Sequence, residues 1–393
     1  MDLRLDPTQE AFRNEVRTWL TANVPVGPLA PLGTRAGVED HRAWERRLFE
    51  GGFAAVHWPA AFGGRAMDPI GTLIFYEEYL RAGAPPRLNR LGLGLAGPTL
   101  IDLGAPEQQD RWLSKILSCE DLWCQGFSEP GAGSDLAGIR TKGEMTAGGI
   151  LVNGQKIWTS HSEFADWMFA LIRTDPDSSR HAGLTYLMID MTDPGVDVRP
   201  IRQLNRTQEF GEVFFTDVLV PYENVVGGIG NGWKVAMRTL VHERGTSLNT
   251  ASHFRVMLEE LIGMIPADQM DDPRILEELG WIHEHIEAYR YMTLRTLSEL
   301  TQGKEAGPQG AMGKLWWSEM QVRIFELGLR TIGARAELWD NDPMSSAPDA
   351  WRQRYWLSRA ALIYAGSNEI QRNIISERVL GLPKGSRRAV RPH

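Results

Sequence analysis

The sequence contains very little cysteine. Its 393 residues include only two cysteines, Cys119 and Cys124. Two cysteines cannot build a disulfide framework, and their spacing matches no metal-ligand pattern. The sequence therefore predicts a protein of a reducing compartment with no metal site.

Positive charge is also in short supply. Lysine and arginine number 42 against 50 aspartates and glutamates, which gives a formal net charge of −8. Nucleic-acid binding requires a basic patch or stripe that faces the phosphates. The main basic cluster consists of Arg387, Arg388 and Arg391, and a solvated tail explains it better than a binding patch. We therefore expect no nucleic-acid partner.

Long apolar runs are missing as well. A helix that crosses a membrane needs about 18 or more apolar residues, and no such stretch occurs. The first six residues, Met1–Asp6, do not combine a cationic segment with a following apolar one, so no secretory signal is predicted. These features predict a cytoplasmic protein with no membrane partner.

The sequence does contain enough apolar residues for a sizeable core. Hydrophobic residues make up 42% of the chain and charged residues 23%, which is typical of a globular protein, and the length suggests two or three packed units. Apolar residues recur with a helical period in the first third, where Thr8 is the predicted N-cap of the first helix. The predicted helices are residues 8–23, 39–51, 69–82, 87–103 and 106–118.

The middle of the chain changes to short segments of alternating polarity, rich in Val, Ile, Phe and Thr. The predicted strands are residues 122–128, 141–146, 150–153, 165–174, 182–191, 196–201 and 211–218. Asn153-Gly154 has the composition of a tight turn and is expected to end the third strand. Seven short strands at this spacing favour a small barrel or sandwich.

The helical period returns after a glycine-rich segment, residues 227–232, and continues to the C-terminus. The helices predicted there are residues 233–262, 272–302, 307–335 and 350–379. We therefore predict an α+β fold of three domains. They are an N-terminal helical domain (1–121), a small central β-barrel or sandwich (122–232) and a C-terminal four-helix bundle (233–393).

The most distinctive segment is residues 123–135, which read Trp-Cys-Gln-Gly-Phe-Ser-Glu-Pro-Gly-Ala-Gly-Ser-Asp. Pro130 restricts its own φ and pushes Glu129 toward extended geometry. Gly131 and Gly133 can adopt positive φ, so the backbone can lie close against a ligand. An ordinary loop would explain Gly-Ala-Gly-Ser by itself. The whole segment, however, resembles the flavin- and acyl-contacting segment of the acyl-CoA dehydrogenase family.

Three further segments carry the same resemblance, which covers essentially the whole chain. Residues 153–160, Asn-Gly-Gln-Lys-Ile-Trp-Thr-Ser, are similar to the family pattern NGxKxWxT. Residues 363–372, Ile-Tyr-Ala-Gly-Ser-Asn-Glu-Ile-Gln-Arg, are similar to IYEGTxxIQR, and the loop of residues 52–64 is similar to GLxGxxWPxxxGG. The order of helices, β domain and helical bundle also agrees with the fold of this family.

The resemblance implies an FAD cofactor and names the residues that would hold it. Trp158 would cover the isoalloxazine ring, Ser160 would bond near flavin N5, and Ser128 would lie near N1 and O2. The implied cofactor-binding residues are Phe127, Ser128, Gly133, Ser134, Trp158, Thr159, Ser160, Arg330, Ser367 and Glu369. The implied substrate-binding residues are Ser134, Tyr364 and Gly366.

One position of the last segment departs from the family pattern. The glutamate that follows the tyrosine, and that removes the substrate α-proton in most members, is Ala365 here. Some members place this base on the first helix of the C-terminal bundle, just before an arginine, and Glu243-Arg244 matches that position. We therefore predict Glu243 as the base, with Arg244 orienting it or holding the helix to a neighbour. A surface Glu–Arg pair, worth at most about 1 kcal/mol, is the alternative.

The resemblance implies α,β-dehydrogenation of an acyl-CoA thioester. Glu243 would take the α-hydrogen as a proton, and the β-hydrogen would leave as a hydride to flavin N5. Ala365 keeps its backbone N–H, which would supply half of the oxyanion hole that polarises the thioester carbonyl. A carboxylate desolvated beside the flavin should have a raised pKa, which suits a general base.

A second departure concerns the FAD pyrophosphate. The family's RxxFG segment has no counterpart between His253 and Tyr289, and the later QxxGGxG run begins with Arg330 in place of glutamine. Arg330 could pair with the pyrophosphate by itself. Alternatively, the adenine half of FAD is held differently, which leaves open whether one kind of subunit completes the site.

The resemblance also implies partners. They are an acyl-CoA with a branched, long or ring-bearing acyl group, as in lipid or steroid catabolism, and an electron-transfer flavoprotein as acceptor. The chain would form a homo-oligomer (dimer or tetramer) or a hetero-oligomer with a related subunit. Two other interpretations stay open: a partner subunit without catalysis of its own, and a flavin oxidase or oxygenase on the same fold.

Overall fold

The computed structural model describes residues 4–178, 180–245, 250–304, 307–308, 310–338 and 349–384. Residues 243–245, 250, 349 and 350 are described by their backbone only. The chain forms two compact units, Met1–Asn249 and Thr250–His393. Among the described residues, the hydrophobic core of the second unit contains only residues of that unit, so each unit buries apolar side chains of its own.

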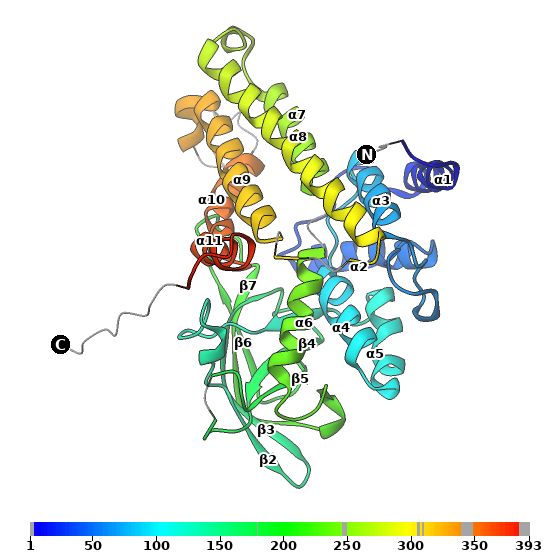
Figure 1. Cartoon of the computed structure of the whole chain (residues 1–393), viewed down its shortest axis with the longest axis vertical. Coiled ribbons are helices and arrows are strands. Elements are labelled where there is room, and N and C mark those ends of the chain that lie inside the picture. The colour runs from blue at the N-terminus through cyan, green and yellow to red at the C-terminus, as the bar shows by residue number, and fades with distance from the viewer. Residues whose placement is uncertain are drawn as a thin grey trace, which may run out of the picture. The chain divides into compact units, whose positions relative to one another are not determined.

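The first unit begins with five α-helices (Figure 1). They are α1 (Pro7–Asn23), α2 (Arg35–Glu50), α3 (Pro69–Arg81), α4 (Gly97–Leu103) and α5 (Pro106–Ser118). The N-cap of α1 is Asp6, so the prediction of Thr8 is wrong. The Asp6 carboxylate accepts hydrogen bonds from the N–H groups of Thr8 and Gln9, and the Gln9 side chain accepts one from the Asp6 N–H. These reciprocal bonds form a capping box, which satisfies the first free donors of the helix.

The predicted helix over residues 87–103 is only partly regular. Residues Gly92–Ala96 form a π-helical turn, and α4 begins after it. The Trp58 ring fills the space beside Gly97, where a Cβ atom would lie 2.0 Å from the ring, and Trp58 Nε1 donates to the Leu93 carbonyl at 3.0 Å. A wedged side chain of this kind accompanies a widened helical turn, which the apolar period alone does not reveal.

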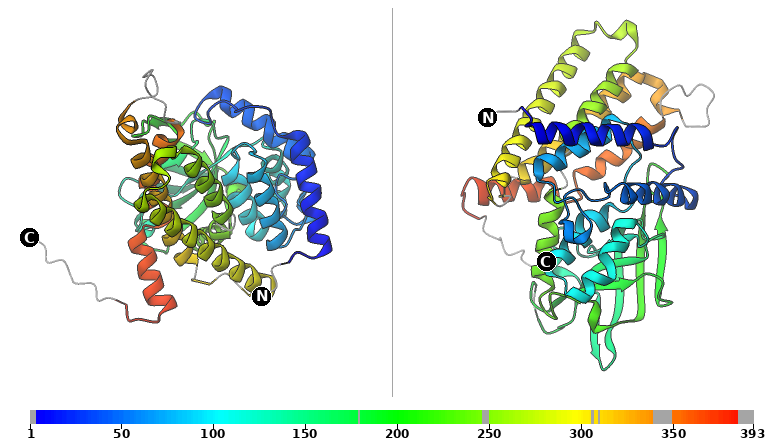
Figure 2. Two further views of the ribbon diagram at one scale, coloured as in Figure 1. Left: turned by 90° about the horizontal axis from the view of Figure 1, so that it is seen from above. Right: turned by 90° about the vertical axis from the view of Figure 1, so that its right-hand side faces the viewer.

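An eight-stranded sheet follows. Its strands are β1 (Trp123–Gly126), β2 (Lys142–Thr146), β3 (Gly149–Ser160), β4 (Trp167–Arg173), β5 (Leu184–Asp190), β6 (Val196–Ile201), β7 (Phe210–Val220) and β8 (Val225–Val226). The hydrogen-bonded order is β6-β7-β3-β2-β4-β5-β8, with β1 parallel to β4. Helices α4 and α5 lie beside the strands (Figure 1 and Figure 2). Trp112 of α5 packs against Trp123 of β1 and Trp167 of β4.

Strand β3 does not end at Asn153-Gly154, so the prediction of a turn there is wrong. The strand continues to Ser160, and its pairing with β7 shifts register between Val152 and Gly154. Gly154 has φ +147°, and the Asn153 side chain bonds the backbone and the carboxylate of Asp217 on β7. The two residues form a bulge inside the strand. The chain reverses instead between β2 and β3, at Ala147-Gly148.

The next helix, α6 (Gly232–Gly245), packs on strands β4 and β5 and on α4 of the first unit. The single helix predicted over residues 233–262 is thus described as two elements, α6 in the first unit and α7 (Thr250–Met264) in the second. The division into three domains stays a prediction.

The second unit is a helical bundle. It contains α7 with α8 (Pro273–Thr301), α9 (Gly310–Ile332), α10 (Asp349–Ala361) and α11 (Asn368–Ile374). Helix α9 contacts each of the others, and Phe254, Ile286, Ile324 and Trp351 belong to their common core. The predicted helix over 307–335 ends as an α-helix at Ile332. Residues Gly333–Glu337 form a 3₁₀ turn that begins with Gly333 at φ +66°.

The helix predicted over residues 350–379 is also wrong as a single element. Helix α10 ends at Ala361, and α11 begins only at Asn368. Between them Ala365 and Gly366 have φ +54° and +81°, a left-handed conformation that no right-handed helix contains. The Ser367 hydroxyl then caps α11 by accepting from the Ile370 N–H.

No described helix combines the length and apolar character that crossing a membrane requires. Within the described ranges no three His, Cys, Asp or Glu side chains gather in a way that could hold a metal ion.

Candidate active site

The segment after β1 forms a tight turn whose tip faces solvent. Glu129 and Ala132 exchange backbone hydrogen bonds at 3.0 Å in both directions, and Pro130 and Gly131 lie exposed between them. Gly133 and Ser134 are exposed just beyond the turn. This arrangement leaves the predicted ligand-facing backbone accessible.

The two residues before this turn differ in burial. Phe127 packs its ring edge-on against Phe169 and Tyr186, so its side chain belongs to the core. Ser128 is half-buried, and its carbonyl accepts from the Ile157 N–H of β3 at 3.0 Å. Phe127 could therefore meet a cofactor only through its backbone, whereas Ser128 is tied directly to the strand that carries Trp158.

The end of β3 presents Trp158 outward. Its side chain is 57% exposed, its φ is +60°, and its ring meets Phe210 of β7 edge-on at 6.2 Å between centroids. Ser160 is half-buried, whereas Thr159 is fully buried and its Oγ1 has no partner in the described part of the chain. Any contact of Thr159 with a cofactor would have to come from its backbone.

A buried ion pair joins these two segments, and sequence reasoning missed it. Lys156 of β3 is fully buried, and its Nζ lies 2.7 Å from Glu129 Oε1. Burial lowers the pKa of Lys156 to about 8, and the ammonium group lowers the pKa of Glu129 below its ordinary range, against burial. The available signal was a lysine at an inward-facing position of an alternating strand.

The predicted base lies on α6, in the first unit. Glu243 and Arg244 are within this helix, but their side chains lie outside the described residues. One residue earlier, His242 Nε2 donates to the Asp102 carboxylate of α4 at 3.0 Å, and Arg238 also donates to Asp102. Burial lowers the pKa of His242. Asp102 therefore anchors the helical turn that precedes Glu243.

The predicted oxyanion donor lies on the turn between α10 and α11. The Gln371 amide donates to the carbonyls of Ala365 and Gly366 at 3.0 and 3.3 Å. No acceptor for the Ala365 N–H occurs among the described residues. Tyr364 is 44% exposed and its ring lies 6.0 Å from Trp317, while Ser367 and Glu369 open helix α11. Gln371, missed by sequence reasoning, holds the left-handed turn.

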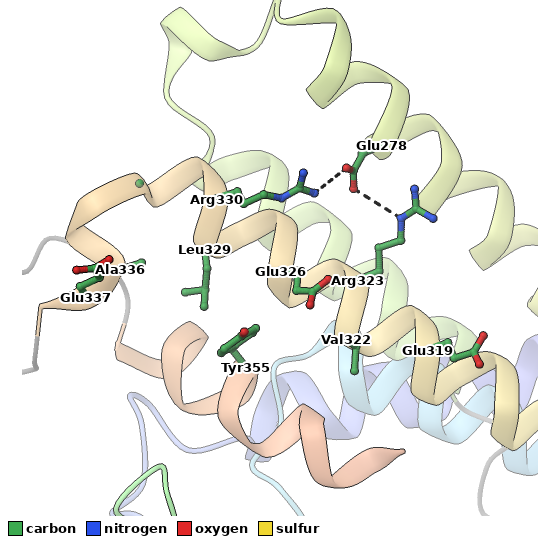
Figure 3. A pocket seen from close by; sticks show the side chains of 11 residues that line it. Glu278, Glu319, Val322, Arg323, Glu326, Leu329, Arg330, Ala336, Glu337 and Tyr355 are labelled. Carbon is green, nitrogen blue, oxygen red and sulfur yellow. Dashed lines mark hydrogen bonds and ion pairs between the residues drawn. The ribbon is translucent and has the colours of Figure 1, made fainter. Parts of the chain in front are cut away.

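Arg330 lies in a groove of the second unit (Figure 3). The groove measures about 920 Å³, and α8, α9, the 3₁₀ turn and α10 line it. Arg330 and Arg323 both reach Glu278, at 2.7 and 3.6 Å. The other ionisable carboxylates of the lining are Glu319, Glu326 and Glu337. Glu319 and Glu326 pair in turn with Arg372 and Arg359. The guanidinium of Arg330 is thus already engaged by Glu278, and a pyrophosphate would have to compete with that carboxylate for its N–H donors.

The predicted site residues thus fall into two groups. The structure brings Ser128, Trp158 and Ser160 together on the outer surface of the first unit, with Gly133 and Ser134 in the adjoining turn. In the second unit it gathers Tyr364 to Glu369 on the turn before α11 and at the start of that helix, and it places Arg330 in the groove on α9.

Comparisons with known proteins agree along the whole chain. The family models described as acyl-CoA dehydrogenase N-terminal, middle and C-terminal domains match residues 6–120, 124–218 and 230–380. The chain belongs to the acyl-CoA dehydrogenase family. It is therefore an oxidoreductase of a flavin-dependent family, as the motifs predicted.

Two relatives of this acyl-CoA dehydrogenase are similar over most of its length. Acyl-CoA dehydrogenase IpdE1 of Mycobacterium tuberculosis is 42% identical over 95% of this chain and 98% of its own. Acyl-CoA dehydrogenase FadE34 of the same organism is 35% identical over 86% of this chain and 46% of its own.

Solved structures confirm the predicted fold. The Tcur3481-Tcur3483 steroid ACAD matches with a TM-score of 0.86 at 24% identity, covering 98% of this chain and 100% of that one. The ChsE4-ChsE5 complex from Mycobacterium tuberculosis matches with a TM-score of 0.83 at 26% identity, again over 98% and 100%. The predicted α+β architecture of an acyl-CoA dehydrogenase is therefore correct.

The residues of the first unit fit a planar aromatic cofactor. The Trp158 ring is 57% exposed on a strand, at a positive φ, and meets Phe210 edge-on, so the exposed part of the ring could stack on a ligand ring. The half-buried hydroxyls of Ser128 and Ser160 lie in the segments that flank it. These residues could cover a flavin ring and bond its edge, whereas the guanidinium of Arg330 is engaged by Glu278.

Proposed function

We propose that this acyl-CoA dehydrogenase binds FAD and oxidises an acyl-CoA thioester between its α and β carbons. The observation that carries the proposal is the exposed Trp158 on β3, tied through Ile157 to Ser128 at the edge of the same surface. Bound FAD would supply the chemistry of hydride acceptance. Everything else in the reaction falls to the chain's own side chains and backbone.

Glu243 is the proposed base. It directly follows His242 on α6, and the bond between His242 and Asp102 holds this part of the helix against α4. The Ala365 N–H is the proposed donor to the thioester oxygen, because the Gln371 bonds hold its turn in one conformation. Ser134, exposed beyond the tight turn, would contact the CoA arm, and Tyr364 and Gly366 the acyl end.

A ring-bearing or branched acyl group is the proposed substrate class. The support is the likeness to a solved structure described as a steroid ACAD and a base position that differs from the common one. The proposed electron acceptor is an electron-transfer flavoprotein.

We also propose that this chain assembles with a related subunit. Glu278 engages both Arg330 and Arg323, which favours a pyrophosphate site completed by another chain. Two of the similar solved structures, Tcur3481-Tcur3483 and ChsE4-ChsE5, are each named for two different proteins, which agrees with such an assembly. A homodimer or homotetramer is the alternative.

The first test is the visible spectrum of the purified chain, with flavin quantified per chain. About one FAD per chain is expected if one kind of subunit completes the site. Little flavin from the chain alone, restored when a related subunit is co-expressed, is expected for the heteromer. A chain that stays free of flavin with every related subunit would contradict the proposal.

Glu243→Gln tests the base. Loss of a general base lowers kcat by roughly 10²- to 10⁴-fold, while flavin content should remain unchanged. The matched control is Glu277→Gln, an exposed carboxylate on α8, which should leave kcat unaltered. A panel of CoA thioesters with straight, branched and ring-bearing acyl groups then reports the substrate class. Rapid reoxidation of the reduced protein by oxygen would favour a flavin oxidase instead.

A further inference from the structure

The buried ion pair between Glu129 and Lys156 lies between the two segments assigned to the flavin. Glu129 directly follows Ser128, and Lys156 precedes Trp158 by two residues. Their side chains are 7% and 0% exposed, and Nζ lies 2.7 Å from Oε1. A movement of either charged group would therefore be transmitted within one or two residues to a proposed flavin contact.

The pair makes more directed bonds than filling a core requires. Lys156 Nζ also donates to the Leu171 carbonyl of β4 at 2.8 Å and to the Phe127 carbonyl at 3.4 Å. All three ammonium protons thus have acceptors. The cation connects strand β3 to strand β4 and to the backbone just before Ser128.

Glu129 is held from the other side. Its Oε2 accepts from the Arg140 N–H at 2.6 Å, and its Oε1 accepts from the Thr141 N–H at 3.0 Å. Thr141 Oγ1 in turn donates to the Gln155 carbonyl, next to Lys156. The pair therefore joins the turn of residues 129–132, the segment of residues 140–141, and strands β3 and β4.

Two apolar side chains could fill the same volume without these bonds. Replacing a buried ion pair by well-packed apolar residues is often neutral or favourable for stability. Stability alone therefore gives little reason for charges here. Directed bonds are the property that only the charged pair supplies, and they fix distances between backbone segments that apolar contacts leave adjustable.

We propose that Glu129 and Lys156 are positioning residues, which set the spacing between Ser128 and the Trp158–Ser160 segment so that both reach one flavin ring. This proposal rests on the proposed function, because it concerns the surface assigned to FAD. The pair itself touches neither cofactor nor substrate.

The experiment measures two properties separately: the unfolding free energy of the flavin-free protein and the Kd for added FAD, by fluorescence titration. Where the wild type needs a related subunit to bind FAD, all measurements use that complex. The variants are Glu129→Gln, Lys156→Met and the double Glu129→Leu with Lys156→Met. The matched control is Glu45→Gln, which breaks an equally buried pair (Arg87 Nη2 to Glu45 Oε2, 2.7 Å) on the N-terminal helices.

All single variants should lose stability, because each leaves a buried partner uncompensated. Only Glu129→Gln and Lys156→Met should raise the FAD Kd, by about tenfold or more, and shift the bound flavin's visible spectrum, whereas Glu45→Gln should bind FAD as the wild type does. The double variant should regain stability but not FAD affinity. If neither single variant accumulates as folded protein, the FAD Kd of the double variant still tests the proposal.

Two results would overturn the inference. One is a double variant that is stable and binds FAD with wild-type affinity and spectrum, since the spacing would then not need the charges. The other is an equal rise in Kd for Glu45→Gln. Failure of the wild type to bind FAD, alone or with any related subunit, would instead overturn the proposed function and this inference with it.

Discussion

Ala365 occupies the position at which most family members carry the base, and it does so in a left-handed conformation. Its φ is +54°, which an alanine adopts at a cost of roughly 1–2 kcal/mol because Cβ approaches the following carbonyl. The neighbouring Gly366, at φ +81°, has no such cost. The two Gln371 bonds offset the strain at Ala365, and they keep the N–H geometry although the carboxylate is gone.

Ala365→Gly should stabilise the second unit slightly. Removing Cβ relieves the strain, and the greater entropy of glycine in the unfolded chain takes back part of the gain, so an increase of about 0.5–1 kcal/mol is expected. Denaturant titration of the flavin-free protein measures it. The control Ala360→Gly, within helix α10, should lose about 1 kcal/mol. A loss at position 365 would show that the strain inferred from φ is absent.

His161 predicts a dependence of stability on pH. Burial, with Arg90 and His41 nearby, lowers the pKa of His161 from 6.5 to about 4. The unfolded chain therefore binds a proton at a higher pH than the folded one, and stability is lost as the pH falls from about 6.5 to 4. Partial burial raises the pKa of the Glu209 carboxyl, which acts in the opposite direction, so a comparison of variants is needed.

His161→Asn removes this titration while tolerating φ +55°. Between pH 7 and 4 the wild type should lose on the order of 2–3 kcal/mol more than the variant. Urea denaturation at several pH values measures the difference. Parallel curves for the two proteins would show that His161 does not stay neutral through that range.

Strand β3 shows how one element positions the site. Its bulge at Asn153-Gly154 changes the register with β7, and a second shift lies between Lys156 and Thr159. Between the two shifts Lys156 points inward to Glu129, and within the second shift Trp158 points outward. The bulges therefore decide which face each side chain occupies.

Gly154→Ala tests the bulge. A Cβ at this position would lie 2.8 Å from Thr141 Cα and would sit at φ +147°, so both contact and conformation oppose it. We expect a loss of about 2 kcal/mol or more, which thermal unfolding measures. Gly148→Ala in the β2–β3 turn meets only Leu219 at 3.6 Å and should change stability little. Equal effects of the two substitutions would contradict the role given to the bulge.

On the scale of the whole molecule, the chain buries its apolar side chains in separate units. The core of the second unit comprises residues of α7 to α10, whereas the sheet and the N-terminal helices form their own clusters. Units with separate cores are able to unfold separately. The flavin-free protein should therefore show two calorimetric transitions.

Two matched core substitutions assign these transitions. Leu187→Ala in β5 and Leu261→Ala in α7 each remove a fully buried leucine and should cost roughly 3–5 kcal/mol. Each should lower the temperature of one transition and leave the other in place. A single transition that both variants shift equally would show that the units unfold as one.

The local pattern of the sequence was enough to predict the family, the chain order of helices, sheet and helices, and the positions of most elements. Periodicity reports which face of an element is buried, and the motifs around Ser128, Trp158 and Tyr364 keep their order whatever the packing. The N-cap at Asp6 could also have been read from sequence, since Asp6 and Gln9 have capping-box spacing.

Only the tertiary structure decided the remaining features. The bulge in β3 and the π-helical turn beside Trp58 depend on residues distant in sequence that occupy or exclude a space. The interruption between α10 and α11 depends on side-chain bonds from Gln371 to a left-handed turn, which periodicity does not report. The same holds for the partners of Lys156 and Arg330. The sequence contains both charges, but an ion pair forms where the fold brings the carboxylate. The fold places Glu129 beside Lys156 and Glu278 beside Arg330.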